Sequence, residues 1–463
     1  MKLAFILAFT LFSQFILAQP FEEYQSFSGQ YDYILVGNTL NSEENNTGTC
    51  TILTQSTATL NLDAGQTVIA AYLYWSGSGS GDFEVTLAGN PLTAERTFSY
   101  TLPSTSFEYF SAFVDVTTLV TTNGNGAYLL SNLNLVSDIQ PYCQSNGGNA
   151  TNYGGWTMVI IYEDGDLPFN DIRIHDGFVA VSASDPMVSI TLDDPVIYSN
   201  TTATLGFLAW EGDSMVANGE NLKINGTIIS DPPLNPADNL FNGTNTFTGS
   251  SDLYNMDLDF FDISGLINET SDFLEIEMNT LQDLIIMNSI VTKVKDATAT
   301  DTDDDLVFDA QEDLNGNRIL EDDDTDGDTI ANFMDDDDDG DGTLTRDEDY
   351  NNNGTPIDDD INGNNIPDYL DDAVFLGVNE FEINTISIVP NPVVDEIFIE
   401  SSDNLNETYH VKVVSITGKV VVDFGEIMVK NNLSLNVTSI NEGLYFLTFQ
   451  QGTNKTTKKF LKL

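Results

Sequence analysis

Acidic side chains recur at fixed spacing between residues 301 and 372, and the best stretch has the pattern of a metal-binding loop. Residues 337–348 fit D-x-D-x-D-G-x5-E at every position. In such a loop, positions 1, 3 and 5 direct oxygens at one centre, glycine at position 6 permits a sharp turn, position 7 gives its carbonyl, and an acid at position 12 closes the shell. About six to eight oxygen ligands suit a hard cation such as Ca²⁺. The pattern therefore predicts several calcium ions along this segment.

The same register can be placed six times, from starts at residues 301, 313, 324, 337, 349 and 360. The predicted metal ligands, loop by loop, are Asp301, Asp303, Asp305, Asp309, Glu312, Asp313, Asn315, Asn317, Glu321, Asp324, Asp326, Asp328, Asp335, Asp337, Asp339, Asp341, Thr343, Glu348, Asp349, Asn351, Asn353, Asp360, Asn362, Asn364, Asp368 and Asp371. Four loops lack glycine at position 6 and have instead Leu306, Arg318, Thr329 and Asn365. The loops abut or share an acid, so no helix fits between them and they are not paired EF-hands.

Position 2 of the best loop is a non-ligating position. Asp338 holds that position in the best loop, whereas Glu348 holds position 12. We therefore expect Glu348→Gln to weaken calcium binding far more than Asp338→Asn.

Charge divides the chain into zones. Residues 301–372 contain 28 acidic and two basic side chains, whereas residues 373–463 contain ten and seven. The predicted domains are a signal peptide at 1–18, a β-sandwich domain at 19–295, calcium-binding repeats at 296–372 and a C-terminal domain at 373–463. A disordered acidic linker is the alternative for the repeats, but their periodicity favours loops that calcium orders. The net charge of −58 excludes nucleic acid and anionic lipid as general electrostatic partners.

The N-terminus has the pattern of a secretory signal peptide. Lys2 precedes an apolar run, Leu3 to Leu17, that is short for a membrane span; an N-terminal anchor is the alternative. No later stretch has 18 consecutive apolar residues, so we expect no transmembrane span in the mature chain. In an exported chain, Cys50 and Cys143 are expected to form a disulfide, the alternative being two unpaired buried cysteines.

Short strand signals separated by Gly, Asn, Asp and Ser clusters fill the first zone. They lie at 68–75, 83–87, 155–162, 178–181, 188–192, 203–210, 273–278 and 284–294. The fold class is therefore expected to be mainly β, with one large jelly-roll-like sandwich and no helices here. Residues 71–77, 154–164 and 259–264 resemble an uncharacterised β domain at the N-terminal end of bacterial surface and adhesin-like proteins.

Catalytic chemistry has few candidates in this domain. His175 is its only histidine and is expected at the surface or a strand edge. Carboxylates near two tryptophans could line a sugar site, although such aromatic residues more often pack a core. This candidate site consists of Glu163, Asp164, Glu211 and Asp213, beside Trp156 and Trp210. We expect no enzyme.

The loop repeats resemble thrombospondin type 3 repeats over residues 301–371. That resemblance implies successive short loops that wrap a string of calcium ions, with little hydrophobic core.

The last zone alternates like a small immunoglobulin-like sandwich. Its seven strand signals lie at 386–389, 396–399, 410–414, 420–422, 433–437, 443–449 and 456–461. Residues 390–392 with Asp395, then 415–419, 443–447 and 458–463, resemble in order the C-terminal sorting domain of type IX secretion substrates. The resemblance implies a Gram-negative source of Bacteroidota type, the type IX secretion machinery as a partner, and release or attachment at the outer cell surface.

Together these features favour a secreted or cell-surface, adhesin-like calcium-binding protein. Its N-terminal domain would bind a glycan or another surface ligand on a calcium-stiffened spacer. The alternative is a secreted glycan hydrolase that uses carboxylates of the first domain.

Overall fold

The computed structural model describes residues 19–193, 196–199, 201–217, 219–270, 273–373, 386–401, 407–430, 433–451 and 454–463. The expected signal peptide lies outside the described residues. The chain forms two compact units, one mainly of residues 19–339 with 344–359, the other mainly of residues 360–463. The expectation of a mainly β protein is confirmed.

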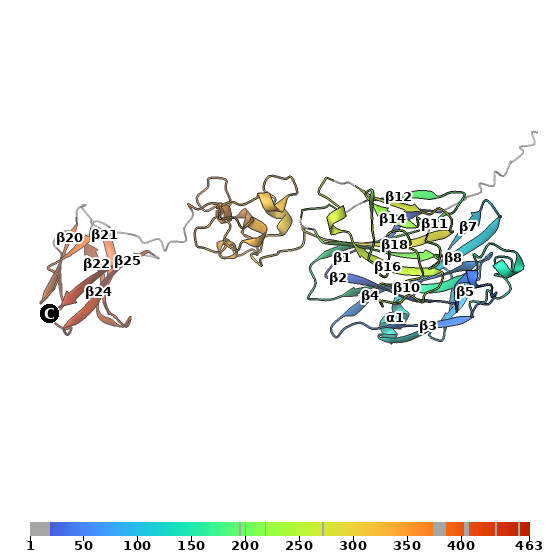
Figure 1. The fold of residues 1–463 in the computed structure, drawn as a ribbon. Coiled ribbons are helices and arrows are strands. Elements are labelled where there is room, and N and C mark those ends of the chain that lie inside the picture. The colour runs from blue at the N-terminus through green and yellow to red at the C-terminus, as the bar shows by residue number, and fades with distance from the viewer. Residues whose placement is uncertain are drawn as a thin grey trace, which may run out of the picture. The chain divides into compact units, whose positions relative to one another are not determined.

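Four antiparallel sheets build the β region of the first unit (Figure 1). The first five-stranded sheet has the order β2 (Tyr31–Thr39), β10 (Gly154–Glu163), β4 (Thr67–Ser78), β8 (Phe107–Asp115), β7 (Arg96–Leu102). The second has the order β1 (Gln19–Gly29), β11 (Asn170–Val181), β18 (Ile285–Lys295), β13 (Ala203–Trp210), β16 (Met256–Asp262). The two four-stranded sheets are β3 (Gln55–Leu60), β9 (Gly126–Ser131), β5 (Glu84–Leu87), β6 (Asn90–Thr93), and β12 (Met187–Asp193), β17 (Phe273–Asn279), β14 (Asn221–Ile224), β15 (Thr227–Ile228).

The four sheets form two sandwiches packed face to face, where the sequence predicted one. One core joins the β2 sheet to the β3 sheet around Trp75 and Trp156, and another joins the β1 sheet to the β12 sheet around Phe207. A third core, with Tyr74 and Trp210, fills the space between the two five-stranded sheets. Strands covered on both faces lose the alternation of apolar and polar residues.

The strand sequences reflect this layering. β10 is buried at eight successive residues from Gly154, and β18 at eight from Ile285. β7 and β17, in contrast, alternate buried with exposed side chains. The continuous apolar runs were the available signal for a central layer, and all eight strand signals of the first zone coincide with strands.

Side-chain links supplement this packing. Arg96 on β7 pairs with Asp176 on β11, with 3.0 Å between Nη1 and Oδ1, and the Tyr74 hydroxyl donates to Asp176 Oδ2 at 2.9 Å. The guanidinium lies 4.0 Å above the Phe113 ring centroid. The predicted disulfide between Cys50 and Cys143 is confirmed, with Cα atoms 5.6 Å apart.

Helices are short. The expectation of none is wrong, because α1 (Thr117–Asn123) follows β8. The β region also contains the 3₁₀ turns η1 (Asn45–Thr47), η2 (Gln144–Asn146) and η3 (Ser264–Leu266). The acidic loops add six 3₁₀ turns, η4 (Asp309–Gln311), η5 (Leu320–Asp322), η6 (Asn332–Met334), η7 (Thr345–Glu348), η8 (Pro356–Asp358) and η9 (Asp368–Leu370). Among the described residues, no helix is long and apolar enough to cross a membrane.

The C-terminal part of the second unit is a seven-stranded sandwich, as predicted. One sheet has the order β19 (Ile386–Val389), β20 (Glu396–Ser401), β23 (Leu433–Asn436), and the other the order β22 (Val420–Val429), β21 (Glu407–Ser415), β24 (Gly443–Gln451), β25 (Asn454–Lys462). Val411, Leu447 and Phe460 are among the residues of its core.

Candidate metal centre

Every acidic loop makes the same backbone turn, with two residues in the left-handed region. At position 6, φ lies between 66° and 96° at Leu306, Arg318, Thr329, Gly342, Gly354 and Asn365. At position 4, φ lies between 57° and 77° at Asp304, Gly316, Gly327, Gly340, Asn352 and Gly363. The left-handed residue at position 4 was not predicted, although every loop has Gly, Asn or Asp there, the types that most readily adopt this conformation.

Side-chain oxygens hold each turn closed. The carboxylate at position 1 accepts a hydrogen bond from the position 6 N–H, as in Asp301 Oδ2 to Leu306 N at 3.0 Å and Asp349 Oδ2 to Gly354 N at 2.8 Å. In all six loops, the side-chain oxygen at position 5 accepts a hydrogen bond from the backbone N–H at position 7, at 2.6–3.0 Å. These bonds direct positions 1 and 5 toward the inside of the turn.

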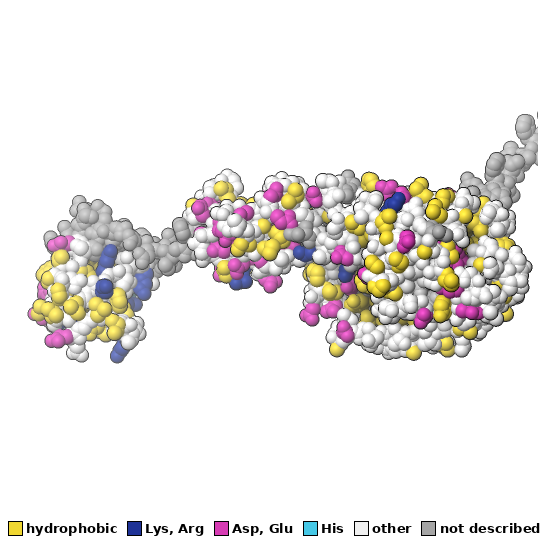
Figure 2. Space-filling view, viewed as in Figure 1, with side chains coloured by type: hydrophobic (Ala, Val, Ile, Leu, Met, Phe, Trp, Pro, Cys, Tyr) yellow, Lys and Arg dark blue, Asp and Glu magenta, His cyan; other side chains and the backbone are white. Residues whose placement is uncertain are grey.

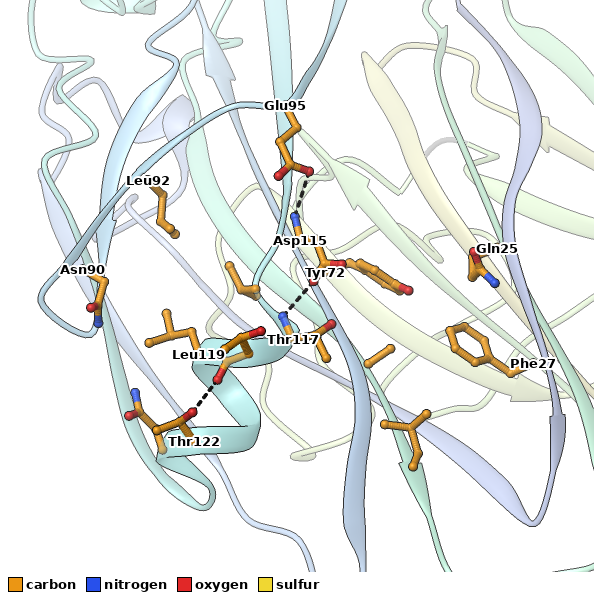
Figure 3. Close-up of a pocket in the computed structure, with 15 residues that line it drawn as sticks. Gln25, Phe27, Tyr72, Asn90, Leu92, Glu95, Asp115, Thr117, Leu119 and Thr122 are labelled. Atoms are coloured by element: carbon orange, nitrogen blue, oxygen red, sulfur yellow. Dashed lines mark hydrogen bonds between the residues drawn. The ribbon is translucent and has the colours of Figure 1, made fainter.

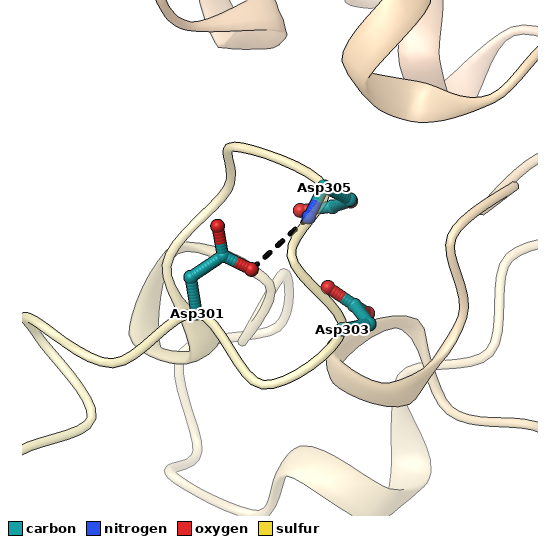
Figure 4. A group of neighbouring side chains, drawn as sticks. All are labelled: Asp301, Asp303 and Asp305. Carbon is teal, nitrogen blue, oxygen red and sulfur yellow. Dashed lines mark hydrogen bonds between the residues drawn. The ribbon is translucent and has the colours of Figure 1, made fainter. Parts of the chain in front are cut away.

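In each of three loops, the turn brings three carboxylates of that loop together. Figure 4 shows Asp301, Asp303 and Asp305 facing one another, and their ligand atoms lie within 4.8 Å. The same limit holds for the triplet Asp324, Asp326, Asp328 and for the triplet Asp337, Asp339, Asp341. Acidic side chains gather over this segment of the surface (Figure 2).

A second kind of cluster joins two loops. Asp305, Glu312 and Asp338 lie within the same 4.8 Å limit and are at most 2 % exposed. Asp338, expected at a non-ligating position of its own loop, thus lies beside two acids of the loop that starts at residue 301. Both carboxylate oxygens of Glu312 and of Asp338 are buried without a hydrogen-bond partner among the described residues.

Burial and mutual repulsion keep these groups protonated in the absence of a cation. Burial, followed by the neighbouring carboxylates, raises the pKa of Glu312 to about 10 and that of Asp338 to about 9. The same causes raise the pKa of Asp303 to about 8. A divalent cation placed among them would offset both effects.

Some loops use acids other than those expected. Asn317 Nδ2 donates to Asp322 Oδ2 at 2.9 Å, whereas Glu321 contacts Ser199 of the β region. Asn353 Nδ2 donates to Asp358 Oδ1 at 3.0 Å. The one-turn helices η5 and η8 place these acids opposite the asparagines, which a fixed twelve-residue register does not anticipate.

The expected ligands of the last and the first loop differ in what they contact. Asp371 Oδ2 accepts hydrogen bonds from Asn362 Nδ2 and Asn364 Nδ2, both at 2.7 Å. Asp368 accepts the N–H of Ile361 at 3.0 Å. In the first loop, Asp309 Oδ2 pairs with Lys295 Nζ at 2.8 Å, so this acid is committed to a salt bridge.

The carboxylates proposed for sugar chemistry do not gather. Trp156 and Trp210 are 0 % exposed and cannot form a surface platform. A Cβ atom added to Gly155 would lie 3.0 Å from the Trp210 ring, while Glu163 is eight residues farther along β10, about 26 Å away. Glu163 and Asp164 are therefore remote from Glu211.

His175 is 4 % exposed in β11, between β1 and β18, so its expected surface position is wrong. Burial lowers the pKa of His175 below 6.5.

An open groove of about 1050 Å³ lies beside α1 (Figure 3). Glu95 and Asp115 line one part, and Gln25 and Phe27 of β1 face them across Tyr72. The Asp115 N–H donates to Glu95 Oε2 at 3.4 Å. This groove combines acids, amides and aromatic rings, which is a composition that can bind a polar ligand.

The second unit contains a segment that matches a known domain family. Residues 387–462 match the family model of the secretion system C-terminal sorting domain. The chain carries a type IX sorting domain. This domain indicates a secreted or cell-surface protein of a Bacteroidota-type bacterium.

No curated protein matches the sequence of this chain. Solved structures with some likeness include BuGH86 in complex with neoagarooctaose, at 10 % identity and a TM-score of 0.17, over 57 % of this chain and 32 % of that one. This chain thus spans about a third of that protein. The major capsid protein P2 from bacteriophage PM2 has 13 % identity, a TM-score of 0.18 and coverage of 57 % and 97 %. The BSP domain of a biofilm associated protein has 8 % identity and a TM-score of 0.14, over 94 % of this chain and 81 % of that one. Such low scores carry no argument about function.

Proposed function

We propose that this protein is a secreted or cell-surface, adhesin-like protein whose acidic loops bind calcium. The observation that carries the proposal is the turn that all six loops share, with left-handed residues at positions 4 and 6 and oxygens at positions 1 and 5 directed inward. Random acidic sequence has no reason to repeat this geometry. Carboxylate, amide and carbonyl oxygens together supply the ligand type that Ca²⁺ prefers.

Two classes of site would hold the ions. Triplets such as Asp301, Asp303 and Asp305 serve one loop each, whereas the cluster of Glu312 and Asp338 with Asp305 binds two loops to each other. Each bound ion cancels two negative charges and orders the loop around it. The apolar residues buried in this segment are few, namely Val307, Leu320, Phe333, Pro356 and Tyr369, so the ions would act as much of its core.

Calcium binding should also secure the attachment of the first loops to the β region. The Ser199 N–H donates to the Arg318 carbonyl at 2.8 Å, and Ser199 Oγ accepts the Leu320 N–H at 2.8 Å. Residues 301–339 and 344–359 of the acidic segment belong to the same compact unit as the sandwiches. The full chain is therefore the right object for testing.

Calorimetric titration of the chelator-treated full chain with Ca²⁺ tests this proposal. Several ions should bind, with Mg²⁺ a poor substitute because it demands a small octahedral shell and loses its water reluctantly. Equal and salt-screened binding of both ions would mean a diffuse counterion cloud and would overturn the proposal.

The groove beside α1 is the proposed ligand site of the N-terminal domain. The full chain can be screened against a glycan array, with Glu95→Gln as the test variant and Glu84→Gln, at an exposed position, as the control. Binding should be lost in Glu95→Gln and retained in Glu84→Gln. A panel of chromogenic glycosides separates binding from catalysis. Turnover that Glu95→Gln abolishes would support the hydrolase alternative instead.

A further inference from the structure

The second acidic loop, which starts at residue 313, differs from the other five at its turn. Arg318 holds position 6 with φ of 66°, a left-handed conformation that a long side chain adopts only at a cost. Position 6 is exposed in the other five loops, whereas Arg318 is half-buried. Arg318 is also one of the two basic residues in 301–372. A residue kept at a strained position suggests a contact that the turn itself does not need.

That contact lies on the β region. Arg318 Nη1 donates to the Glu269 carbonyl at 3.3 Å, and the Arg318 carbonyl accepts the Ser199 N–H at 2.8 Å. Farther along the loop, the Leu320 N–H donates to Ser199 Oγ at 2.8 Å, and Ser199 Oγ donates to Glu321. The strip from Arg318 to Glu321 therefore pairs with the β region through both backbone and side chains.

Glu321 has a different role in this loop from the one that the twelve-residue register assigns. The register makes it a metal ligand, yet its carboxylate contacts Ser199. Asp322 lies opposite the two asparagines instead, with Oδ1 3.0 Å from Asn315 Nδ2 and Oδ2 2.9 Å from Asn317 Nδ2. The loop thus has a residue that contacts the β region where the register expects a ligand.

The surface that receives the strip is anchored in a hydrophobic core. Ser199 lies between Ile197 and the start of β13, and Glu269 follows Ile267 in the segment after η3. Ile197 and Ile267 are 1 % and 9 % exposed, and both belong to the core between the β1 and β12 sheets. A loop held at this surface therefore moves with that sandwich.

The predicted calcium ligands of the loop hold the same strip. Asp313 Oδ2 accepts the Arg318 N–H at 2.9 Å, and Asn317 Oδ1 accepts the Ile319 N–H at 2.6 Å. A cation bound by Asp313 and Asn317 would fix these side chains and, through them, the backbone of the strip. Without a cation, Asp313 and the four successive acids at 321–324 repel one another. The conformation that pairs with the β region is then no longer favoured.

We propose that the second loop is a calcium-operated clamp, which fixes the acidic segment to the sandwich of the β1 and β12 sheets. The clamp consists of the strip from Arg318 to Glu321, with Ser199 and the Glu269 carbonyl as its partners on the β region. This inference rests on the proposed calcium binding and adds that one loop converts binding into a fixed attachment.

Trypsin tests the clamp on the unmodified full chain. Arg318 and Arg346 are the two tryptic sites in 301–372, because this segment contains no lysine. Arg318 pairs with the β region, whereas Arg346 is exposed in η7 of the fourth loop. Calcium should slow cleavage after both residues relative to chelator, because it orders both loops.

Ser199→Ala separates the clamp from the order of the loop. Digested in calcium, this variant should be cleaved after Arg318 at least severalfold faster than the parent. Cleavage after Arg346 and the number of calcium ions bound should not change. Ser99→Ala, at an exposed position of β7, is the matched control and should behave as the parent does at both sites.

Arg318→Gly is a second variant, which keeps the proposal testable if Ser199→Ala destabilises the β region. Glycine suits the left-handed turn, so the number of bound calcium ions should stay at the parental value. Loss of the contact with Glu269 should nevertheless speed hydrogen exchange at the Ser199 N–H in calcium. Asn365→Gly makes the same kind of change in the sixth loop and should leave that exchange unchanged.

Two results would overturn the clamp. One is equal cleavage after Arg318 in the parent and in Ser199→Ala, which would show that loop order alone protects this bond. The other is hydrogen exchange at Ser199 that is the same with and without calcium. Either result can occur while calorimetry shows calcium binding, and the proposed function then stands. Absence of calcium binding would overturn both proposals.

Discussion

Asp338 shows how the role of one carboxylate depends on a neighbouring loop. Its position in its own loop is non-ligating, yet its side chain is 2 % exposed beside Asp305 and Glu312. The sequence register treats each loop separately and therefore cannot assign this acid.

We predict that Asp338→Asn weakens calcium binding about as much as Glu348→Gln, by roughly tenfold or more, because each removes a buried charged ligand. The exposed Asp347→Asn is the matched control and should have little effect. Calorimetry of the full chain measures all three. Retention of parental affinity in Asp338→Asn would remove the two-loop cluster from the set of sites.

Backbone strain at position 6 gives a second residue-scale prediction. Thr329 has φ of 86° and an exposed side chain, and a β-branched residue in this region costs about 1–2 kcal/mol. After the entropy cost of glycine, Thr329→Gly should stabilise the loop by about 0.5–1 kcal/mol and raise its calcium affinity severalfold. Calcium titration measures the change.

The adjacent Ile330→Gly is the control. Its φ is not positive and its side chain is 43 % exposed, so glycine there adds only entropy cost and should lower the affinity. Equal effects of both changes would contradict the strain argument.

The burial of His175 predicts that the stability of the β region depends on pH. Because burial lowers its pKa below 6.5, the unfolded chain gains a proton below that pH that the folded chain does not bind. The free energy of unfolding should therefore fall as the pH drops below 6.5, by up to about 1.4 kcal/mol per pH unit from this group. His175→Gln should remove this component.

Denaturant titrations followed by tryptophan fluorescence, above and below pH 6.5, test the prediction. His410→Gln in the sorting domain is the control, since no tryptophan lies there. An unchanged pH slope in His175→Gln would mean that the buried imidazole does not titrate differently in the two states.

At the scale of elements, layers of sheet explain the strand sequences. β4 and β10 carry apolar residues on both faces because each is covered by a four-stranded sheet on one side and by the other five-stranded sheet on the other. The disulfide lies in the first sandwich, where Cys143 is 0 % exposed, and closes a separation of 93 residues.

Removing the disulfide should destabilise the β region. Replacement of Cys50 and Cys143 by serine together should lower the free energy of unfolding by up to about 4–5 kcal/mol on the chain-entropy estimate. Reversible denaturation of parent and variant measures the loss. Free-thiol labelling of the unfolded, unreduced parent is the control and should find no reactive sulfur.

At the scale of the whole molecule, the chain combines an export signal with a β region and acidic loops. The sorting domain has its own core, which includes Val411, Leu447 and Phe460. Its removal should therefore leave the remaining structure intact while preventing passage through the outer membrane.

Deletion of residues 386–463 should trap the protein in the periplasm of a type IX-competent host. Immunoblots of periplasmic and external fractions measure this, and calcium binding by the purified truncated chain shows that it still folds. Normal appearance of the truncated protein outside the cell would contradict the assignment of export to this domain.

Features that depend on local pattern could be predicted from the amino-acid sequence. Strand alternation, the sorting-domain motifs and the positions of the loop turns are all encoded in residues close together in the chain, and the eight strand signals of the first zone and the seven of the last each coincide with a strand. The loop register likewise located every left-handed residue at position 6.

Features that depend on residues far apart in the chain became visible only in the folded protein. The approach of Asp338 to Glu312, the burial of His175, and the hydrogen bond between Asn45 and Glu211 each bring together segments that are far apart in the chain. Whether a carboxylate is solvated, paired or buried depends on which sheet covers it. An acidic residue type alone carries no information about that environment, because its energetics are set by burial and by neighbouring charges.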